Sequence, residues 1–287
     1  GLMGAYGAAI YAKGICPKEQ PRSSMLGAQQ LENFQHESKP VVCQGCTNHC
    51  NLTVNIFAGG ERYISGNRCE KPLGLGKERQ LPDLYRFKLE QIRALSEDCA
   101  KRAAAHTGKR GVIGLPLGLN MYENLFFWEA FFRNLDFDIV VSDLSSRALY
   151  AKGQYSVPSD TACYPAKLSH GHIEALLQRD DLTAIFYPCL PYNVDEHKGD
   201  NHYNCPVVAY YPELLMANCE KLNHNNFLYP FLDLNRRGHV VKTLSTIFSR
   251  YATKKQVETA LEHGFAALEQ YRKDITAEGE EIVRQAR

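Results

Sequence analysis

Short apolar segments alternate with helical segments from about residue 108 onwards, and this alternation constrains the fold more than any other feature of the sequence. The apolar segments lack a polar face, which is typical of strands that are covered on both sides. Such strands, separated by helices, form a parallel sheet with helices on each face. We therefore predict an α/β fold, a flavodoxin-like parallel sheet with helices on both faces. The predicted strands span residues 111–117, 137–142, 182–187, 206–210 and 226–231, and the predicted helices span 122–135, 165–177, 236–250 and 253–287.

Composition divides the 287 residues into five regions. Residues 1–14 are rich in glycine and alanine and predict one short helix that cannot bury itself, so we expect them to be the tail of a preceding domain in a longer polypeptide. Residues 15–40 carry several prolines and are typical of a linker. Residues 41–80 form a cysteine-rich hairpin module and residues 81–252 the α/β domain. Residues 253–287 are expected to form a helical segment that leads to a following region.

Four of the ten cysteines lie close together in the hairpin region, namely Cys43, Cys46, Cys50 and Cys69. Strands are predicted over 52–57 and 62–65, with a turn between them. A module this short buries little apolar surface, so we expect a bound metal to hold it together. The spacing suits both zinc and an iron–sulfur cluster. A disulfide pair and four unrelated thiols are the alternatives, and His49 either replaces one ligand or is a solvated loop residue.

Three further cysteines, Cys163, Cys189 and Cys205, each lie beside a proline at the end of a predicted element. Cys189 follows a strand and Cys163 precedes a helix, so we expect both above the carboxyl edge of the sheet, where open α/β folds bind their ligands. Three thiolates hold a four-iron (4Fe-4S) cluster and leave one iron open to a non-protein ligand. Cys205 precedes a predicted strand, which places it at the opposite edge unless residues 190–204 fold back.

Three basic side chains near these cysteines are candidates for contacts to a cluster or substrate. Lys167 and His170 follow Cys163 on the same predicted helix, and their spacing of three places them on one side of it. The alternative role of this pair is a polar helix face. Arg147 follows a polar segment after the second predicted strand, where it either caps a loop or binds an anion.

The sequence disfavours several classes of function. Lysine and arginine number 33 against 32 aspartates and glutamates, so there is no basic surplus for nucleic-acid phosphates. No apolar run reaches the length of a membrane span, and the apolar start of the chain lacks the basic leader of a signal peptide. Clustered cysteines in a chain of this kind indicate a reducing, cytoplasmic location. A phosphate-binding loop, a dinucleotide fingerprint and a hydrolase nucleophile elbow are absent.

Six segments of the sequence together carry a family resemblance. They are CQGCTNHCNLTV from Cys43, ISGNRCEK from Ile64, NMYEN from Asn120, SDLSSR from Ser142, CYPAKLSHGHI from Cys163 and FYPC from Phe186. With these motifs, nearly the whole chain resembles the activase-related region of large 2-hydroxyacyl-CoA dehydratase activases. In that family the region follows ATPase domains of the actin and heat-shock-protein type, and residues 4–9 look like the last helix of such a domain.

The resemblance implies an electron-transfer system of anaerobic metabolism. ATP hydrolysis in the activase would drive a low-potential electron into a dehydratase-type redox partner, which reduces a thioester or another difficult substrate. By the same resemblance, Cys163, Cys189 and Cys205 correspond to the three cluster ligands of the dehydratase-like fold. The nucleotide-binding residues of the ATPase are absent from these 287 residues, so we do not expect them to hydrolyse ATP alone.

The leading hypothesis is an iron–sulfur electron-transfer module of an ATP-dependent activase. Its expected partners are the adjoining ATPase domain of the same polypeptide and a dehydratase-type redox protein, with a homodimer as an option. A first alternative is a non-catalytic adaptor in which zinc at the hairpin cysteines only staples the fold and the α/β domain docks a partner. A second alternative is a dehydratase or reductase subunit acting directly on an acyl-CoA, although the sequence offers no adenine or pantetheine signature.

Overall fold

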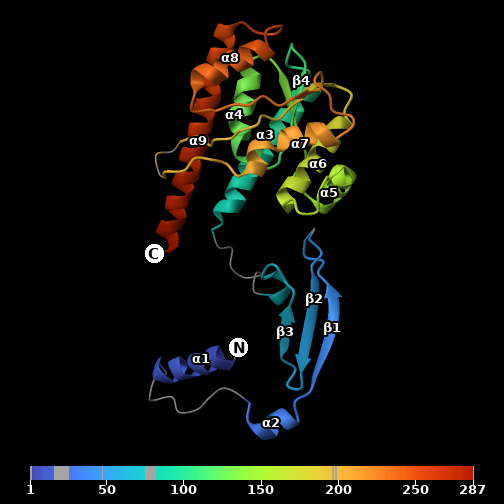
Figure 1. Cartoon of the computed structure of the whole chain (residues 1–287), viewed down its shortest axis with the longest axis vertical. Coiled ribbons are helices and arrows are strands. Elements are labelled where there is room, and N and C mark those ends of the chain that lie inside the picture. The colour runs from blue at the N-terminus through green and yellow to red at the C-terminus, as the bar shows by residue number, and fades with distance from the viewer. Residues whose placement is uncertain are drawn as a thin grey trace. The chain divides into compact units, whose positions relative to one another are not determined.

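The computed structural model describes residues 2–15, 26–46, 48–74, 82–195, 197 and 199–286. The chain divides into two compact units, Gly1–Arg79 and Gln80–Arg287. Figure 1 labels the elements of each unit. The predicted hairpin lies in the first unit and the predicted parallel sheet in the second.

The first unit contains a three-stranded antiparallel sheet of order β1-β2-β3. Strands β2 (Asn51–Phe57) and β3 (Arg62–Ser65) form the predicted hairpin, which is confirmed. Strand β1 (His36–Val42) pairs with β2 and includes residues that we expected in the linker. Its sequence is polar and contains Pro40, both unusual in strands, but an edge strand tolerates proline. The unit also contains the helices α1 (Leu2–Ile15) and α2 (Ala28–Glu32) and the short 3₁₀ helix η1 (Lys71–Leu73).

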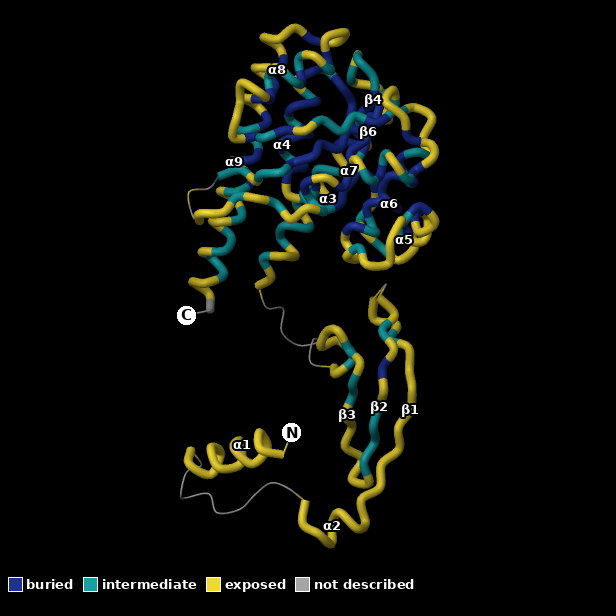
Figure 2. Tube along the Cα trace, viewed as in Figure 1, coloured by how far each residue is buried: buried dark blue, intermediate teal, exposed yellow. Residues whose placement is uncertain are grey.

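Very little of the first unit is buried. Among its described residues, Leu52 on β2 is the only buried one, and the others are half-buried or exposed. Helix α1 is exposed along its whole length, including the large side chains of Leu2 and Ile10, as the exposed colour in Figure 2 shows. The described part of this unit therefore has no hydrophobic core of its own.

The second unit contains a four-stranded parallel sheet of order β5-β4-β6-β7. In chain order this is the second, first, third and fourth strand, which is the flavodoxin-like arrangement. The predicted fold class is confirmed. The strands are β4 (Val112–Leu115), β5 (Asp138–Val141), β6 (Leu182–Phe186) and β7 (Phe227–Leu228).

Helices flank the parallel sheet (Figure 1). The long helix α9 packs along α4, α6 packs against both α5 and α7, and α3 packs on β5. No helix in the described part of the chain is both long enough and apolar enough to span a membrane. The helices are α3 (Leu84–Ala104), α4 (Met121–Asn134), α5 (Arg147–Gly153), α6 (Tyr164–Leu177), α7 (Pro206–Asn218), α8 (Arg237–Ile247) and α9 (Lys254–Ala286), with the 3₁₀ helix η2 (Gln154–Ser156) after α5.

Aromatic side chains of α4 fill the core of the second unit. Trp128 is fully buried and lies 4.7 Å from the ring of Phe186 on β6, centroid to centroid. Phe132 contacts the same Phe186 ring edge-on at 5.0 Å. Helix α9 approaches closely at Gly264, where an added Cβ would lie 3.0 Å from the carbonyl oxygen of Phe127. These rings therefore have a packing role and do not form a cofactor site.

The strand prediction for residues 206–210 is wrong, because these residues begin helix α7. The run Pro-Val-Val-Ala-Tyr is apolar and β-branched, which suits a buried strand. The competing signal is the proline at the first helical position, whose fixed φ favours a helix start. Pro206 occupies that position, and Cys205 is the N-cap residue.

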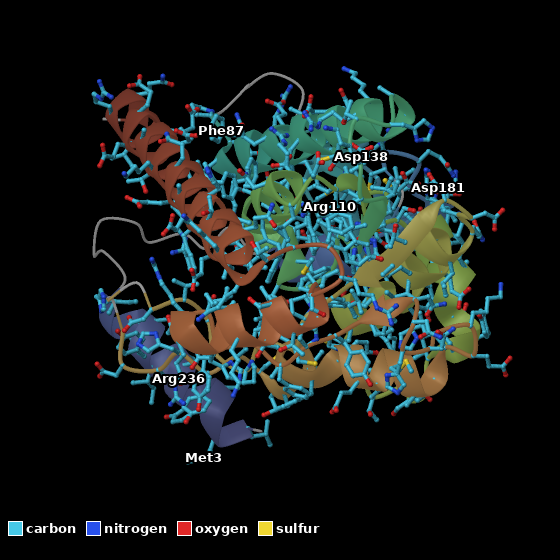
Figure 3. The ribbon with its side chains drawn as sticks, turned by 90° about the horizontal axis from the view of Figure 1, so that it is seen from above. Met3, Phe87, Arg110, Asp138, Asp181 and Arg236 are labelled. Atoms are coloured by element: carbon cyan, nitrogen blue, oxygen red, sulfur yellow. The ribbon has the colours of Figure 1, made fainter. Side chains whose placement is uncertain are left out.

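The amino ends of the strands are occupied by structural polar contacts. Thr107 Oγ1 donates to Asp138 Oδ1 at 2.7 Å, and Arg110 Nη1 donates to the Leu135 carbonyl oxygen at 3.1 Å. Arg110, Asp138 and Asp181 are labelled in Figure 3. Asp181 is paired with Arg179, so Arg110, Asp138 and Asp181 are engaged within the fold. Parallel α/β sheets bind their ligands at the opposite, carboxyl edge.

Candidate site at the carboxyl edge of the parallel sheet

The direction of α6 fixes which of its ends lies at the carboxyl edge. An added Cβ on Gly118, which follows β4, would lie 3.1 Å from Ser169 Oγ in the first half of α6. An added Cβ on Gly114, inside β4, would lie 3.4 Å from Leu176 Cδ2 near the end of α6. Helix α6 therefore runs antiparallel to β4, and its N-cap residue, Cys163, lies at the carboxyl edge.

Cys163 and Cys205 occupy equivalent positions on two neighbouring helices. Cys163 is the N-cap of α6 with φ −63° and ψ 152°, and Cys205 is the N-cap of α7 with φ −61° and ψ 152°. Each is followed by a proline in the first helical turn, and both cysteines are exposed. Helix α7 connects the parallel strands β6 and β7, so its N-terminus belongs to the carboxyl edge as well.

The segments 190–195 and 199–204 lie against each other, so the chain folds back, which is the condition under which Cys205 reaches the carboxyl edge. Asn193 N donates to the carbonyl oxygen of His202 at 2.7 Å, and Asn204 N donates to that of Pro191 at 2.9 Å. Cys205 therefore lies close to Leu190 and Pro191, the residues that directly follow Cys189. Of the two placements of Cys205 that the sequence left open, the structure therefore has the one at the carboxyl edge, because the segment expected to be a strand is the start of α7.

Cys189 extends the pairing of β6 beyond its carboxyl end. Its backbone N donates to Pro230 O, and Leu232 N donates to its carbonyl oxygen, both at 2.9 Å. The thiol is fully buried, and burial raises its pKa to about 12, with an opposing hydrogen bond from the backbone of Glu213. Glu213 lies about two turns, or about 12 Å, along α7 from Cys205, so the Cys189 thiol faces the middle of α7.

The structure thus brings the three cysteines to one edge of the sheet but does not bring their thiols together. Cys163 and Cys205 point to solvent from adjacent helix ends, whereas Cys189 faces inward. No three His, Cys, Asp or Glu side chains in the described ranges are arranged to hold a metal ion. All nine cysteines in these ranges are free thiols.

His170, a candidate for cofactor contact, is fully buried in a hydrogen-bonded network. Ser156 Oγ donates its proton to Gly153 O at 3.0 Å, so it accepts from Nδ1 of His170 at 2.8 Å. Nε2 of His170 then accepts from the hydroxyl of Tyr211 on α7 at 3.1 Å. Burial lowers the pKa of His170 to about 4, which keeps the ring neutral. The geometry gives His170 a structural role between α6 and α7.

His172 forms a second buried network that reaches the edge. Leu117 N donates to Ser142 Oγ at 2.8 Å, and Ser142 Oγ lies 2.8 Å from His172 Nδ1. His172 Nε2 lies 3.0 Å from Oγ of the exposed Ser145. The arrangement that satisfies every group has Ser142 donating to Nδ1 and Nε2 donating to Ser145. Burial lowers the pKa of His172 to about 4, so this ring is also neutral.

The two other candidates for cofactor contact differ in their surroundings. Lys167 Nζ donates to the carbonyl oxygen of Asp160 at 2.7 Å, and its side chain is 16% exposed. This hydrogen bond from Lys167 therefore stabilises the loop that precedes Cys163. Arg147 is the first residue of α5 and is exposed, so its guanidinium is accessible at the same edge.

The four described cysteines of the first unit gather at one end of its sheet. Cys43, Cys46 and Cys50 lie in the connection between β1 and β2, and Cys69 follows β3. Cys43 and Cys50 are half-buried, and Cys46 and Cys69 are exposed. His49 lies in the same connection, is exposed and has a φ of 43°.

Sequence reasoning missed the partners of both histidines. Tyr211 directly follows the segment 206–210 that was predicted as a strand, and nothing in its sequence neighbourhood points to His170. Ser142 and Ser145 were noted as part of a motif, and their position at and just after the carboxyl end of a predicted strand was a usable signal for a site at the carboxyl edge. The pairing with His172 depends on the packing of α6 against β4 and β5.

The fold and this edge define a class: a flavodoxin-like α/β domain with cysteines at the starts of two adjacent crossover helices. Residues 112–287 match the family model described as the CoA enzyme activase uncharacterised domain. The chain belongs to that family, and the resemblance to activase-related regions is confirmed. Searches of the curated proteins and of the solved structures find no match to this chain.

Proposed function

We propose that this chain is the iron–sulfur electron-transfer module of a CoA enzyme activase system. Cys163, Cys189 and Cys205 would hold a 4Fe-4S cluster at the carboxyl edge of the parallel sheet. The observation that carries the proposal is the matched placement of Cys163 and Cys205, both exposed N-cap residues of neighbouring helices. Family membership supports the activase part of the proposal.

The donor set suits such a cluster in its chemistry. Thiolates are the ligands that iron–sulfur clusters use, and three of them lie on segments that end at one edge. The N-termini of α6 and α7 carry partial positive charge that favours an anionic cluster. Prolines in the first turn of each helix fix the backbone beside the ligand.

Cys189 joins the ligand set only after its thiol turns away from α7. The buried thiol has a raised pKa, so it becomes a thiolate when a metal cation is present to compensate the charge. Pro212 lies inside α7 next to Glu213, where it removes one helical hydrogen bond. This weak point lowers the cost of moving the first turns of α7 away from Cys189.

A cluster held by three thiolates supplies one-electron chemistry at an iron atom that is open to a further ligand. The chain itself would position that cluster, shield it on the side of the sheet, and present it at the exposed edge. A dehydratase-type protein is the expected electron acceptor, an ATPase domain of the same polypeptide the expected source of energy, and the cytoplasm the expected location.

The test is anaerobic purification followed by analysis of iron, sulfide and zinc, with absorption and electron paramagnetic resonance spectra. We expect Cys163→Ser, Cys189→Ser and Cys205→Ser each to lose iron and sulfide together. Cys99→Ala, which changes a buried thiol of α3, is the control and should retain both. Unchanged iron in the Cys163 and Cys205 variants would contradict the proposal, and zinc without any iron would favour the adaptor hypothesis instead.

A further inference from the structure

The first unit needs a source of stability other than apolar packing. Leu52 is its one buried side chain in the described ranges, and the neighbours on the same face of the sheet, Val54, Ile56 and Ile64, are only half-buried. Small modules without a sufficient core are commonly held by disulfides or a structural metal. The described cysteines of this unit are free thiols, which leaves a metal.

Two of these thiols are opposite each other at the end of the sheet. Cys43 N donates to Cys50 O at 2.9 Å, which continues the β1–β2 ladder beyond its last pair, Val42 and Asn51. Residues opposite each other on antiparallel strands project to the same face, with Cβ atoms about 5 Å apart. Cys43 and Cys50 therefore project together, on the same face as Leu52.

The third thiol lies on a turn that wraps the sulfur of Cys43. Gly45 N donates to Cys43 Sγ at 3.4 Å. This hydrogen bond fixes the position of the Cys43 sulfur relative to the turn. Cys46 is the residue after Gly45, so the same turn holds a second sulfur close to that of Cys43.

The fourth thiol follows a segment that passes beside the same end of the sheet. Gly66 has a φ of 82°, and an added Cβ would lie 2.4 Å from Asn51 O, so the chain leaving β3 runs against the start of β2. Two residues beyond Cys69, the side chain of Lys71 packs on the turn at Gly45, with its Cδ 3.9 Å from the position of an added Cβ there. Cys69 thus lies in the sequence between a residue that contacts the start of β2, Gly66, and one that contacts the cysteine-bearing connection, Lys71.

We propose that Cys43, Cys46, Cys50 and Cys69 bind one Zn²⁺ ion as four thiolates and that this ion replaces a hydrophobic core in the first unit. Structural zinc is tetrahedral with Zn–S bonds of about 2.3 Å, which places its sulfurs about 3.8 Å apart. A cross-strand pair such as Cys43 and Cys50 converges readily to that separation. In a four-iron cluster each thiolate binds a different iron atom, so its ligands must spread further apart than this cross-strand pair.

Two further features of the proposed zinc site are the charges beside its ligands and the movement that brings the ligands together. Four thiolates around Zn²⁺ leave an excess of negative charge, and the residues around Cys69 offset part of it, since Arg68 and Lys71 outnumber Glu70 by one charge. Across the residues that the structure places, no three potential ligands are arranged to hold an ion. The turn at Cys46 and the segment at Cys69 therefore close on the metal as it binds, and binding is coupled to folding of the unit.

The experiment measures metal content in the full chain and in two variants. We expect one zinc per chain by elemental analysis of protein purified under reducing conditions, and its loss in Cys43→Ser and in Cys69→Ser. Wild-type protein stripped of metal and titrated with Co²⁺ should show the absorption bands of a tetrahedral thiolate site, saturating at one equivalent. This spectrum decides the question even where a serine variant fails to fold.

Two controls make the result specific. His49→Asn should retain zinc, since asparagine tolerates the positive φ of that residue. Cys205→Ser should retain zinc although the proposed cluster site requires it to lose iron, so the two proposals fail separately. The zinc site is overturned by zinc that persists in both hairpin variants, by iron and sulfide in its place at these residues, or by a Cys43–Cys50 disulfide in reduced preparations.

Discussion

The hydroxyl of Tyr211 on α7 donates to Nε2 of His170 on α6 across 3.1 Å, and neither group is exposed. This bond connects the two helices whose first residues follow Cys163 and Cys205. It therefore helps to fix the relative positions of two of the proposed cluster ligands.

Removal of the Tyr211 hydroxyl should weaken the second unit without emptying its core. Tyr211→Phe keeps the ring but leaves Nε2 of His170 as a buried acceptor without a donor, which costs about 1–3 kcal/mol of unfolding free energy. Urea denaturation measures this loss. Tyr210→Phe, on the exposed side of the same helix, is the matched control and should change stability by less than about 0.5 kcal/mol. Equal effects of the two substitutions would show that the Tyr211 bond does not hold α6 to α7.

Stability should fall on acidification because two buried histidines are neutral in the folded protein. The pKa values of His170 and His172 are lowered from 6.5 to about 4 by burial. The unfolded chain takes up protons as pH falls below about 6.5 while the folded chain does not, so the contribution is complete above that pH and is lost towards pH 4. Each histidine accounts for about 3 kcal/mol over this range.

Unfolding free energies from urea titrations at several pH values between 7 and 4 test this dependence. His172→Asn should make the pH dependence shallower. His106→Asn, at an exposed residue with positive φ, should leave it unchanged. A pH dependence that is the same in all three proteins would mean that the histidines do not carry it.

The crossing of α5 and α6 depends on the absence of a side chain at Gly171. An added Cβ there would lie 2.1 Å from the carbonyl oxygen of Leu149, a contact that backbone cannot relieve without moving a helix. We expect Gly171→Ala to destabilise the second unit by about 1–3 kcal/mol in thermal or urea unfolding. Gly238→Ala on α8 meets no atom within 4 Å and should stabilise the protein by about 0.5–1 kcal/mol. The opposite signs of two identical substitutions make the comparison decisive.

The parallel sheet was predictable because its strands are short, apolar on both faces and separated by amphipathic helices. The failure at residues 206–210 has a physical reason, since a run of five apolar residues has no period that separates a strand from a buried helix. The Cys-Pro start of that run matches the Cys-Tyr-Pro start of α6, and this start signal was the better evidence. Strand β1 carried no apolar alternation, and only its pairing with β2 makes it a strand.

The sequence predicted that the candidate site lies at the carboxyl edge of the parallel sheet, but it did not predict the directions or partners of the side chains there. The rule that parallel strands place ligands at their carboxyl ends located Cys163 and Cys189 from the sequence. The direction of the Cys189 thiol depends on α7, which packs over it from a part of the chain that was predicted as a strand. The partners of His170 and His172 lie far away in the sequence, so only the packed structure reveals them.

Thiol reactivity should divide the three proposed ligands into two groups. Cys163 and Cys205 are exposed and Cys189 is buried, so iodoacetamide added to iron-free native protein should label the first two rapidly. Cys189 should react at least about 100-fold more slowly, because its thiol is reached only through local opening of the fold. Mass spectrometry of peptides follows each site, with the buried Cys99 as a slow reference.

After anaerobic reconstitution with iron and sulfide, Cys163 and Cys205 should become protected as well. Continued rapid labelling of both in protein that contains a full complement of iron would place the cluster elsewhere.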